Sequence, residues 1–139
     1  MTFEESIEIG STPEKVFSLY KDVSNWKVWD KEVKCSTLKG AFLEGSVGSL
    51  TPSKGPKAQI ILSKVEENKS FTSKSNLPFC VMYFEHCLVQ KNDTVLVVHR
   101  VSFKGAFSYI FGYLIGHSIK KSLPITLQGL KSLAENGYV

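Results

Sequence analysis

The chain has 139 residues, of which 42% are hydrophobic and 22% charged, with 17 Lys and Arg against 13 Asp and Glu. These values are typical of one ordinary globular domain, and no repeat, low-complexity tract or linker divides residues 1–139. The net charge is +4, but the lysines are scattered and Arg100 is the only arginine, whereas nucleic-acid-binding surfaces cluster their basic residues. We therefore expect no nucleic-acid partner.

The sequence favours a cytoplasmic protein. Residues 1–10 lack the basic start and apolar run of a signal peptide. The most apolar window, residues 106–119, is shorter than the roughly 20 residues that span a bilayer, so we expect no stable membrane insertion. The three cysteines, Cys35, Cys80 and Cys87, have no CxxC spacing and are typical of free thiols in a reducing compartment.

The N-terminal segments predict one strand followed by two short helices. Apolar and polar residues alternate over Thr2–Gly10, which is the period of a strand with one wet face. Ser11 and Glu14 then have the spacing of a capping box, which predicts the start of a helix of two to three turns. Asp22–Asp30 is consistent with a second short helix.

Two tryptophans, Trp26 and Trp29, are three residues apart and share one face of that second helix. Two interpretations are open. The pair either closes one end of the core or forms the rim of a ligand entrance.

Short strands fill the middle of the chain. We expect strands at Lys31–Lys39 and Val47–Thr51, and then a hairpin of Lys57–Val65 and Ser70–Ser75 around residues 66–69. The register of this hairpin is left open, because its apolar residues do not assign its faces.

The final hairpin has a more specific pattern. Phe79–Gln90 and Thr94–Lys104 read as long strands, and Asn92-Asp93 suits a two-residue turn. Residues whose numbers sum to 185 then face one another. This register predicts that Glu85 pairs with Arg100 on the wetter face, and that His86 lies beside His99 on the inner face.

Residues 106–135 predict a long terminal helix. Its apolar stripe recurs at steps of three and four and consists of Phe107, Phe111, Ile115, Ile119, Leu123, Leu127, Leu130 and Ala134. Pro124 removes one helical hydrogen bond, so we expect a bend there, with Ser122 capping a restarted second half. The simplest α+β architecture is a curved antiparallel sheet of about six or seven strands wrapped around this helix, with the two short helices after the first strand.

This order resembles the helix-grip fold of START domains, the birch-pollen-allergen class and the bacterial polyketide cyclase/dehydrase-like (SRPBCC) proteins. The residues that carry the resemblance are Ile7-Glu8-Ile9, Thr12-Pro13-Glu14-Lys15-Val16-Phe17, Asp22 with Trp26 and Trp29, His86, Thr94, His99-Arg100-Val101, Gly105, Leu123-Pro124, Leu130-Lys131 and Ala134-Glu135. The resemblance implies a small apolar molecule held between sheet and helix. Some members of these families are aromatase/cyclases, and others bind lipids, quinones or sterols.

We therefore predict a cavity that binds a small apolar or amphipathic ligand, such as a lipid, quinone or polyketide-like molecule. The candidate binding residues are Trp29, Phe84, His86, His99, Val101, Phe103, Phe107, Tyr109, Phe111 and Ile115. The alternative is a cyclase or dehydrase that uses His86 and His99 as acid–base groups, with Tyr109 as a further candidate to polarise a carbonyl.

Other chemistries find little support in the sequence. We expect no metal site, because Cys87 points away from His86 in the predicted register and three or four ligands would be needed. No nucleophile motif or phosphate-binding glycine loop is present, and we expect no cofactor. A membrane-surface role for Phe107–Ile115 is disfavoured, because the helix would have to leave the sheet and uncover the core. The oligomeric state is left open.

Overall fold

The computed structural model describes all 139 residues and contains seven strands and four helical segments. The elements are β1 (Thr2–Ile9), α1 (Pro13–Lys21), the 3-10 turn η1 (Val23–Asn25), α2 (Trp26–Trp29), β2 (Val33–Leu38), β3 (Val47–Pro52), β4 (Ala58–Glu66), β5 (Ser70–Leu77), β6 (Cys80–Gln90), β7 (Val95–Lys104) and α3 (Ser108–Asn136). The expected order of elements is confirmed. The second predicted helix is a 3-10 turn that continues into one α-helical turn.

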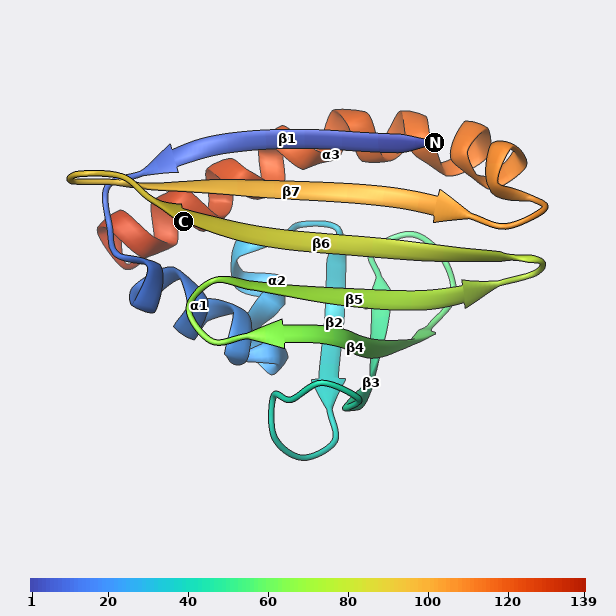
Figure 1. Cartoon of the computed structure of the whole chain (residues 1–139), viewed down its shortest axis with the longest axis horizontal. Helices are drawn as coiled ribbons and strands as arrows, with labels where there is room; N and C mark the ends of the chain where they lie inside the picture. Colours follow the sequence, from blue (N-terminus) through green and yellow to red (C-terminus); the bar gives the residue numbers. More distant parts are fainter.

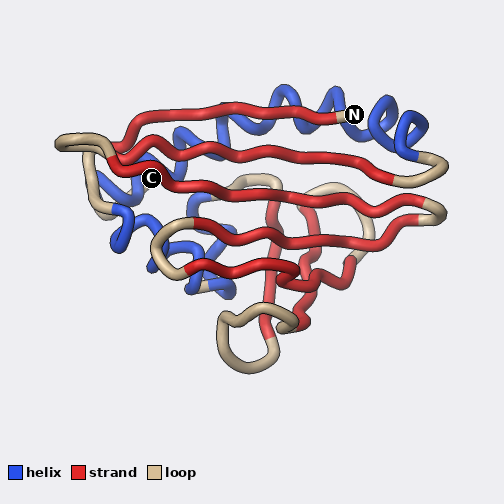
Figure 2. Tube along the Cα trace, in the orientation of Figure 1, coloured by secondary structure: helices blue, strands red, loops and turns tan.

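The strands form one antiparallel sheet in the order β1-β7-β6-β5-β4-β3-β2 (Figure 1). Figure 2 shows the helices gathered on one side of the sheet, while β2 and β3 turn behind β4 and β5, so that the sheet curls. The helix α3 runs along β1 and β7, and its second half meets α1 and α2. The predicted α+β architecture of a curved sheet around a long terminal helix is confirmed.

The predicted register of the β6–β7 hairpin is confirmed along its length. Glu85 faces Arg100 and His86 faces His99, and the amide of Lys91 donates to the carbonyl of Thr94 across the two-residue turn. Apolar side chains alternate with wetter ones on both strands, and a slip of one residue would place them on the wrong face of the sheet.

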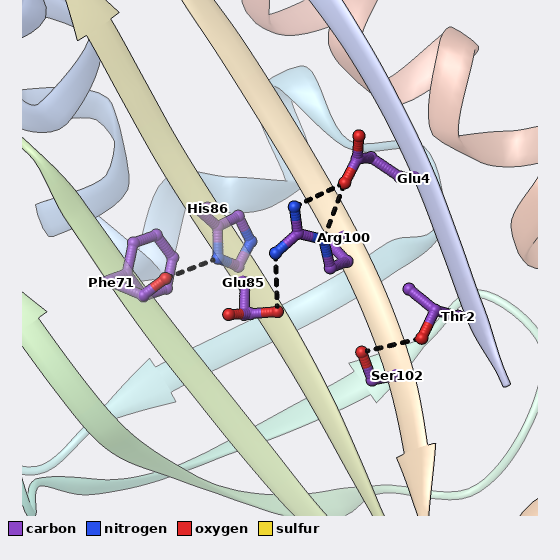
Figure 3. A network of polar contacts seen from close by, with 7 residues as sticks. All are labelled: Thr2, Glu4, Phe71, Glu85, His86, Arg100 and Ser102. Atoms are coloured by element: carbon purple, nitrogen blue, oxygen red, sulfur yellow. Dashed lines mark hydrogen bonds and ion pairs between the residues drawn. The ribbon is translucent and has the colours of Figure 1, made fainter.

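Arg100 joins three strands on the outer face of the sheet (Figure 3). Its Nη1 lies 3.5 Å from Oε2 of Glu85 in β6, as the register predicted. On its other side, Nη2 lies 2.6 Å from Oε1 of Glu4 in β1, and Nε donates to the same oxygen at 2.7 Å. Glu4 is therefore the nearer partner, which the hairpin alone could not predict.

Arg100→Gln should leave the fold intact and lower the free energy of unfolding by less than about 2 kcal/mol, because each exposed ion pair contributes only about 0.2–1 kcal/mol. Urea titration of both proteins measures the difference. A loss of several kcal/mol would mean that Arg100 does more than bridge exposed carboxylates.

The cap of α1 differs from the sequence-based expectation. Thr12, not Ser11, is the N-cap, and its hydroxyl accepts a hydrogen bond from the amide of Lys15 at 3.2 Å. Pro13 occupies the first helical position, where its missing amide proton is harmless. Because the cap lies one residue later, Glu14 falls short of the position that completes a capping box.

The long helix is not interrupted at Pro124. It is one α-helix from Ser108 to Asn136, and the hydroxyl of Ser122 donates to the carbonyl of Ile119 at 3.3 Å instead of capping a new start. The predicted restart is therefore wrong, and the bend remains a prediction. α3 packs against β1, β7 and α2, and this packing can offset the hydrogen bond that is lost at Pro124. None of the helices combines the length and apolarity needed to cross a bilayer.

Candidate functional site

The two histidines of the final hairpin lie side by side on the inner face of the sheet. His99 is fully buried and His86 nearly so, and their ring centroids are 4.7 Å apart at 76°. This is the pairing that the register predicted.

The ring of His86 is held between two phenylalanines. It stacks on Phe71 of β5 at 3.9 Å and on Phe84 of β6 at 4.3 Å, with both pairs nearly parallel. Its Nδ1 lies 3.2 Å from the carbonyl oxygen of Phe71, which can only accept, so Nδ1 donates (Figure 3). Burial, followed by the neighbouring His99, lowers the pKa of His86 well below its usual value.

His99 contacts a residue that the sequence did not suggest for the site. Tyr20 of α1 is fully buried, and its hydroxyl lies 2.8 Å from Nε2 of His99. Burial lowers the pKa of His99 to about 3 and raises the pKa of Tyr20 well above its usual value. A phenolic hydroxyl on the core-facing side of α1 was the one signal available, because a buried Tyr hydroxyl usually finds a partner.

Two buried nitrogens near this pair have no hydrogen-bond partner: Nδ1 of His99 and Nε1 of Trp29. The rings of these two residues are 6.4 Å apart. Buried polar atoms are nearly always paired in folded proteins, so each of these nitrogens is a candidate to bind a ligand atom or a water.

The tautomer of His99 follows from which of the two groups, Tyr20 or His99, donates the hydrogen bond between them. The hydroxyl of Tyr20 has no other partner, so donating its proton to Nε2 satisfies both groups and leaves the ring proton of His99 on Nδ1. If Nε2 of His99 donated to the Tyr20 oxygen instead, both the Tyr20 hydroxyl proton and Nδ1 of His99 would be left without a partner. Both unpartnered nitrogens, Trp29 Nε1 and His99 Nδ1, are therefore N–H donors.

The two tryptophans have different roles. Both belong to the main core cluster, and the indole of Trp26 donates to the carbonyl of Tyr20 at 2.8 Å. Trp29 is also buried, and it lies against both Tyr20 and His99. The two tryptophans thus differ in hydrogen bonding: the Trp26 indole is satisfied, and the Trp29 indole N–H has no partner.

The apolar candidates divide by position. Val101 and Phe103 are buried in a second core cluster, and Phe84, Phe111 and Ile115 are half-buried against it. Two other predicted residues do not join them: Phe107 packs on Phe79 at one end of the molecule, and Tyr109 points outward from α3 and is exposed. Tyr109 is therefore separated from the histidines that it was expected to assist.

Two of the clefts at the surface border α3. One of about 370 Å³ lies between the short helices and the end of α3 and is lined by Leu19, Asp22, Asn25, Val28, Trp29 and Leu133. The other, of about 320 Å³, lies between β1 and α3 and is lined by Thr2, Phe3, Glu4, Glu5, Lys120 and Leu123. Only Trp29 of the predicted residues borders either cleft, so an internal cavity lined by the whole set remains a prediction.

Comparison with known proteins identifies the fold. No family model matches the chain, and no protein of curated function matches it in sequence. Among solved structures, the di-domain ARO/CYC StfQ from the steffimycin biosynthetic pathway superposes with a TM-score of 0.77 at 9% identity, over 96% of this chain and 50% of that one. The chain has the helix-grip fold.

Two further structures share this helix-grip fold. Truncated norcoclaurine synthase from Thalictrum flavum superposes with a TM-score of 0.73 at 9% identity, over 98% of this chain and 94% of that one. The Aha1 dimer from Colwellia psychrerythraea gives a TM-score of 0.73 at 17% identity, over 99% and 98%. At these identities the likeness concerns the arrangement of the helix-grip chain, and the chemistry must be argued from its own residues.

Proposed function

We propose that this protein binds a small apolar or amphipathic ligand, of the lipid, quinone or polyketide-like class, between the sheet and α3. The observation that carries the proposal is the pair of buried, unpartnered donors, Trp29 Nε1 and His99 Nδ1, on neighbouring rings. An unpaired buried donor costs about 1–3 kcal/mol, and a ligand acceptor would recover that loss.

The donors suggest which end of the ligand enters first. Two N–H groups suit an oxygen that only accepts, such as a carbonyl or quinone oxygen, better than a hydroxyl. The half-buried side chains of Phe84, Phe111 and Ile115 provide apolar contacts for the rest of the molecule. The proposed ligand is therefore a largely hydrocarbon molecule with one carbonyl-type oxygen at its inner end.

Turnover by a cyclase or dehydrase mechanism is the alternative, since an ARO/CYC protein and a norcoclaurine synthase share the fold. Such a reaction needs a base whose pKa lies near the working pH. His99 titrates at about 3, and the pKa of His86 is also lowered, so both are weak bases in this site. Neither histidine is suited to abstract a proton near neutral pH, and this favours binding.

The proposal predicts that a carbonyl-bearing ligand depends on the two donors. An alkyl-substituted benzoquinone should raise the melting temperature of the wild type, and Trp29→Phe, which removes one donor, should weaken its binding by about 3–10-fold, the worth of one hydrogen bond. His99→Gln should weaken it less, because the glutamine amide keeps an N–H donor. The affinity for an alkylbenzene of the same chain length, which has no oxygen, should fall much less in the same variants. Comparing the two ligands within each variant separates the hydrogen bond from any general loss of stability.

His117→Gln is the matched control, because His117 lies on the exposed face of α3 away from the paired histidines. Its affinity for both ligands should equal that of the wild type. The proposal fails if fatty acids, quinones and polyaromatic compounds all leave the melting temperature of the wild type unchanged. Equal weakening of the quinone and the alkylbenzene by Trp29→Phe would contradict the role of the donors.

A further inference from the structure

The outer side of the first half of α3 is apolar and uncovered. Residues 109, 110, 113 and 114 lie on one side of the helix at steps of one, three and four, and they are between 51% and 74% exposed. On the opposite side of the helix, Gly112 and Gly116 meet Met1 and the ring of Phe3. The uncovered residues are two aromatic and two aliphatic side chains: Tyr109, Ile110, Tyr113 and Leu114.

Phe79 extends this surface under backbone strain. It follows Pro78 in the two-residue turn between β5 and β6, and its φ of 55° lies in the left-handed region, where Gly or Asn normally sits. Its side chain is nevertheless 74% exposed, so it adds little to the core. A large exposed side chain in a strained position suggests a role outside folding.

The turn and the helix form one continuous surface. The ring of Phe79 packs edge-on against Phe107 at 5.2 Å, and the amide of Phe107 donates to the carbonyl of Phe79 at 3.1 Å. Figure 1 shows the β5–β6 turn and the start of α3 at the same end of the molecule. We name this surface the apolar end face; it consists of Phe79, Phe107, Tyr109, Ile110, Tyr113 and Leu114.

The charged residues of α3 and of the end of β7 next to the apolar end face are all lysines, while Glu4 and Glu5 of β1 share a cleft with Lys120. No Asp or Glu occurs between Gly105 and Ala134. Lys120 and Lys121 follow one to two turns later on the exposed side of α3, and Lys104 ends β7 just before the helix. An apolar surface with tyrosines and bordering lysines complements the interface of an anionic bilayer.

We propose that the apolar end face docks on the surface of an anionic lipid bilayer, with its aliphatic and aromatic side chains at the level of the head groups. The helix does not need to leave the sheet, because Phe111, Ile115 and Ile119 remain packed toward the core on its other side. The sequence-based reason against a membrane-surface role therefore does not apply. The inference is independent of the ligand proposal.

A second copy of the chain fits this surface less well. A two-fold contact places the same patch on both partners, so it would bring the lysines at positions 120 and 121 of both copies around one apolar centre. α3 has no acidic residue between Gly105 and Ala134, Glu4 of β1 is paired with Arg100, and Glu5 of β1 is then one carboxylate beside two lysines. Like charges around a contact oppose association, whereas anionic lipid head groups neutralise them.

Co-sedimentation with vesicles tests the proposal. The wild type should sediment with phosphatidylcholine vesicles that contain about 30 mol% phosphatidylserine, much less with phosphatidylcholine alone, and less at about 0.5 M salt. Lys120→Gln with Lys121→Gln should lower the partition coefficient for anionic vesicles roughly 10–30-fold. Tyr113→Ser with Leu114→Ser should lower it about tenfold or more for both kinds of vesicle.

Phe79→Gly separates docking from folding. Glycine adopts the left-handed conformation freely, so this variant should be at least as stable as the wild type while its vesicle binding falls several-fold. Leu43→Ser is the control for the loss of an exposed apolar side chain, since Leu43 lies in the loop between β2 and β3. Its vesicle binding should be unchanged.

Three outcomes would overturn the proposal. One is wild-type protein that stays in the supernatant with anionic vesicles. Another is undiminished binding after the Tyr113 and Leu114 changes. The third is a concentration-dependent dimer in analytical ultracentrifugation that these changes abolish, without any vesicle binding, because the face would then join two copies of the chain.

Discussion

Acidification from pH 7 to pH 4 should remove about 3 kcal/mol from the free energy of unfolding through His99 alone. The pKa of His99 is about 3 in the folded protein, against an ordinary value of 6.5. Between these values the unfolded chain binds a proton on this residue that the folded chain does not. Stability is therefore fully present above pH 6.5 and falls as the pH is lowered toward 3.

His86 acts in the same direction, because burial and His99 lower its pKa as well. Replacement by glutamine isolates the contribution of His99, since Gln does not titrate and its carbonyl can still accept from Tyr20. His99→Gln should be less stable than the wild type at pH 7. The difference in free energy of unfolding between the two proteins should become about 3 kcal/mol smaller at pH 4.

Urea titrations at half-unit pH steps measure this effect, and the ring-proton chemical shifts of His99 report its protonation directly. His117→Gln makes the same substitution at an exposed histidine of α3 and is the control. Parallel curves for His99→Gln and the wild type would mean that His99 titrates alike in the folded and unfolded states.

The parts of the fold that the sequence predicted depend on local periodicity. The β6–β7 register followed from one turn and from the match of Glu85 with Arg100, because a slip of one residue reverses every side chain. The core-facing side of α3 followed from its stripe at steps of three and four. Tyr109, which was nevertheless predicted as a site residue, lies off that stripe and is exposed.

The parts that were missed depend on contacts between distant segments. The hydrogen bond from Tyr20 to His99 joins residues 79 positions apart, and nothing near Tyr20 in the chain indicates its partner. Glu4 reaches Arg100 only because β1 adds to the edge of the sheet beside β7. The unbroken helix at Pro124 is also a tertiary effect, since local preference alone would end it.

The strained turn at Phe79 could not be predicted for a different reason. A Pro-led turn with a large aromatic at its third position contradicts the usual preference for Gly or Asn, so the sequence places the residue at the start of a strand. The structure begins β6 at Cys80 and leaves Phe79 outside it. Such local conflicts between residue and backbone are expected where function outweighs stability.

Gly129→Ala should lower the free energy of unfolding by about 2–3 kcal/mol, which corresponds to a fall in melting temperature on the order of 10 °C. Gly129 is buried in the second half of α3, and a Cβ added to it would overlap the carbonyl oxygen of Trp29. Main-chain atoms of α2 cannot rotate aside as a side chain can. The two helices would have to separate, and Trp29 would move away from His99.

Gly112→Ala makes the same change on the same helix and is the matched control. The three atoms nearest to its Cβ would all belong to the side chain of Met1, which is flexible, half-exposed and at the start of the chain. Alanine favours a helix over glycine by about 0.8–1 kcal/mol, so Gly112→Ala should be neutral or stabilising. The two variants are compared by thermal unfolding and by near-ultraviolet circular dichroism, which reports the packing environment of the tryptophans. If Gly129→Ala matched Gly112→Ala in both, α3 would not approach α2 closely enough to hold Trp29 beside the histidine pair.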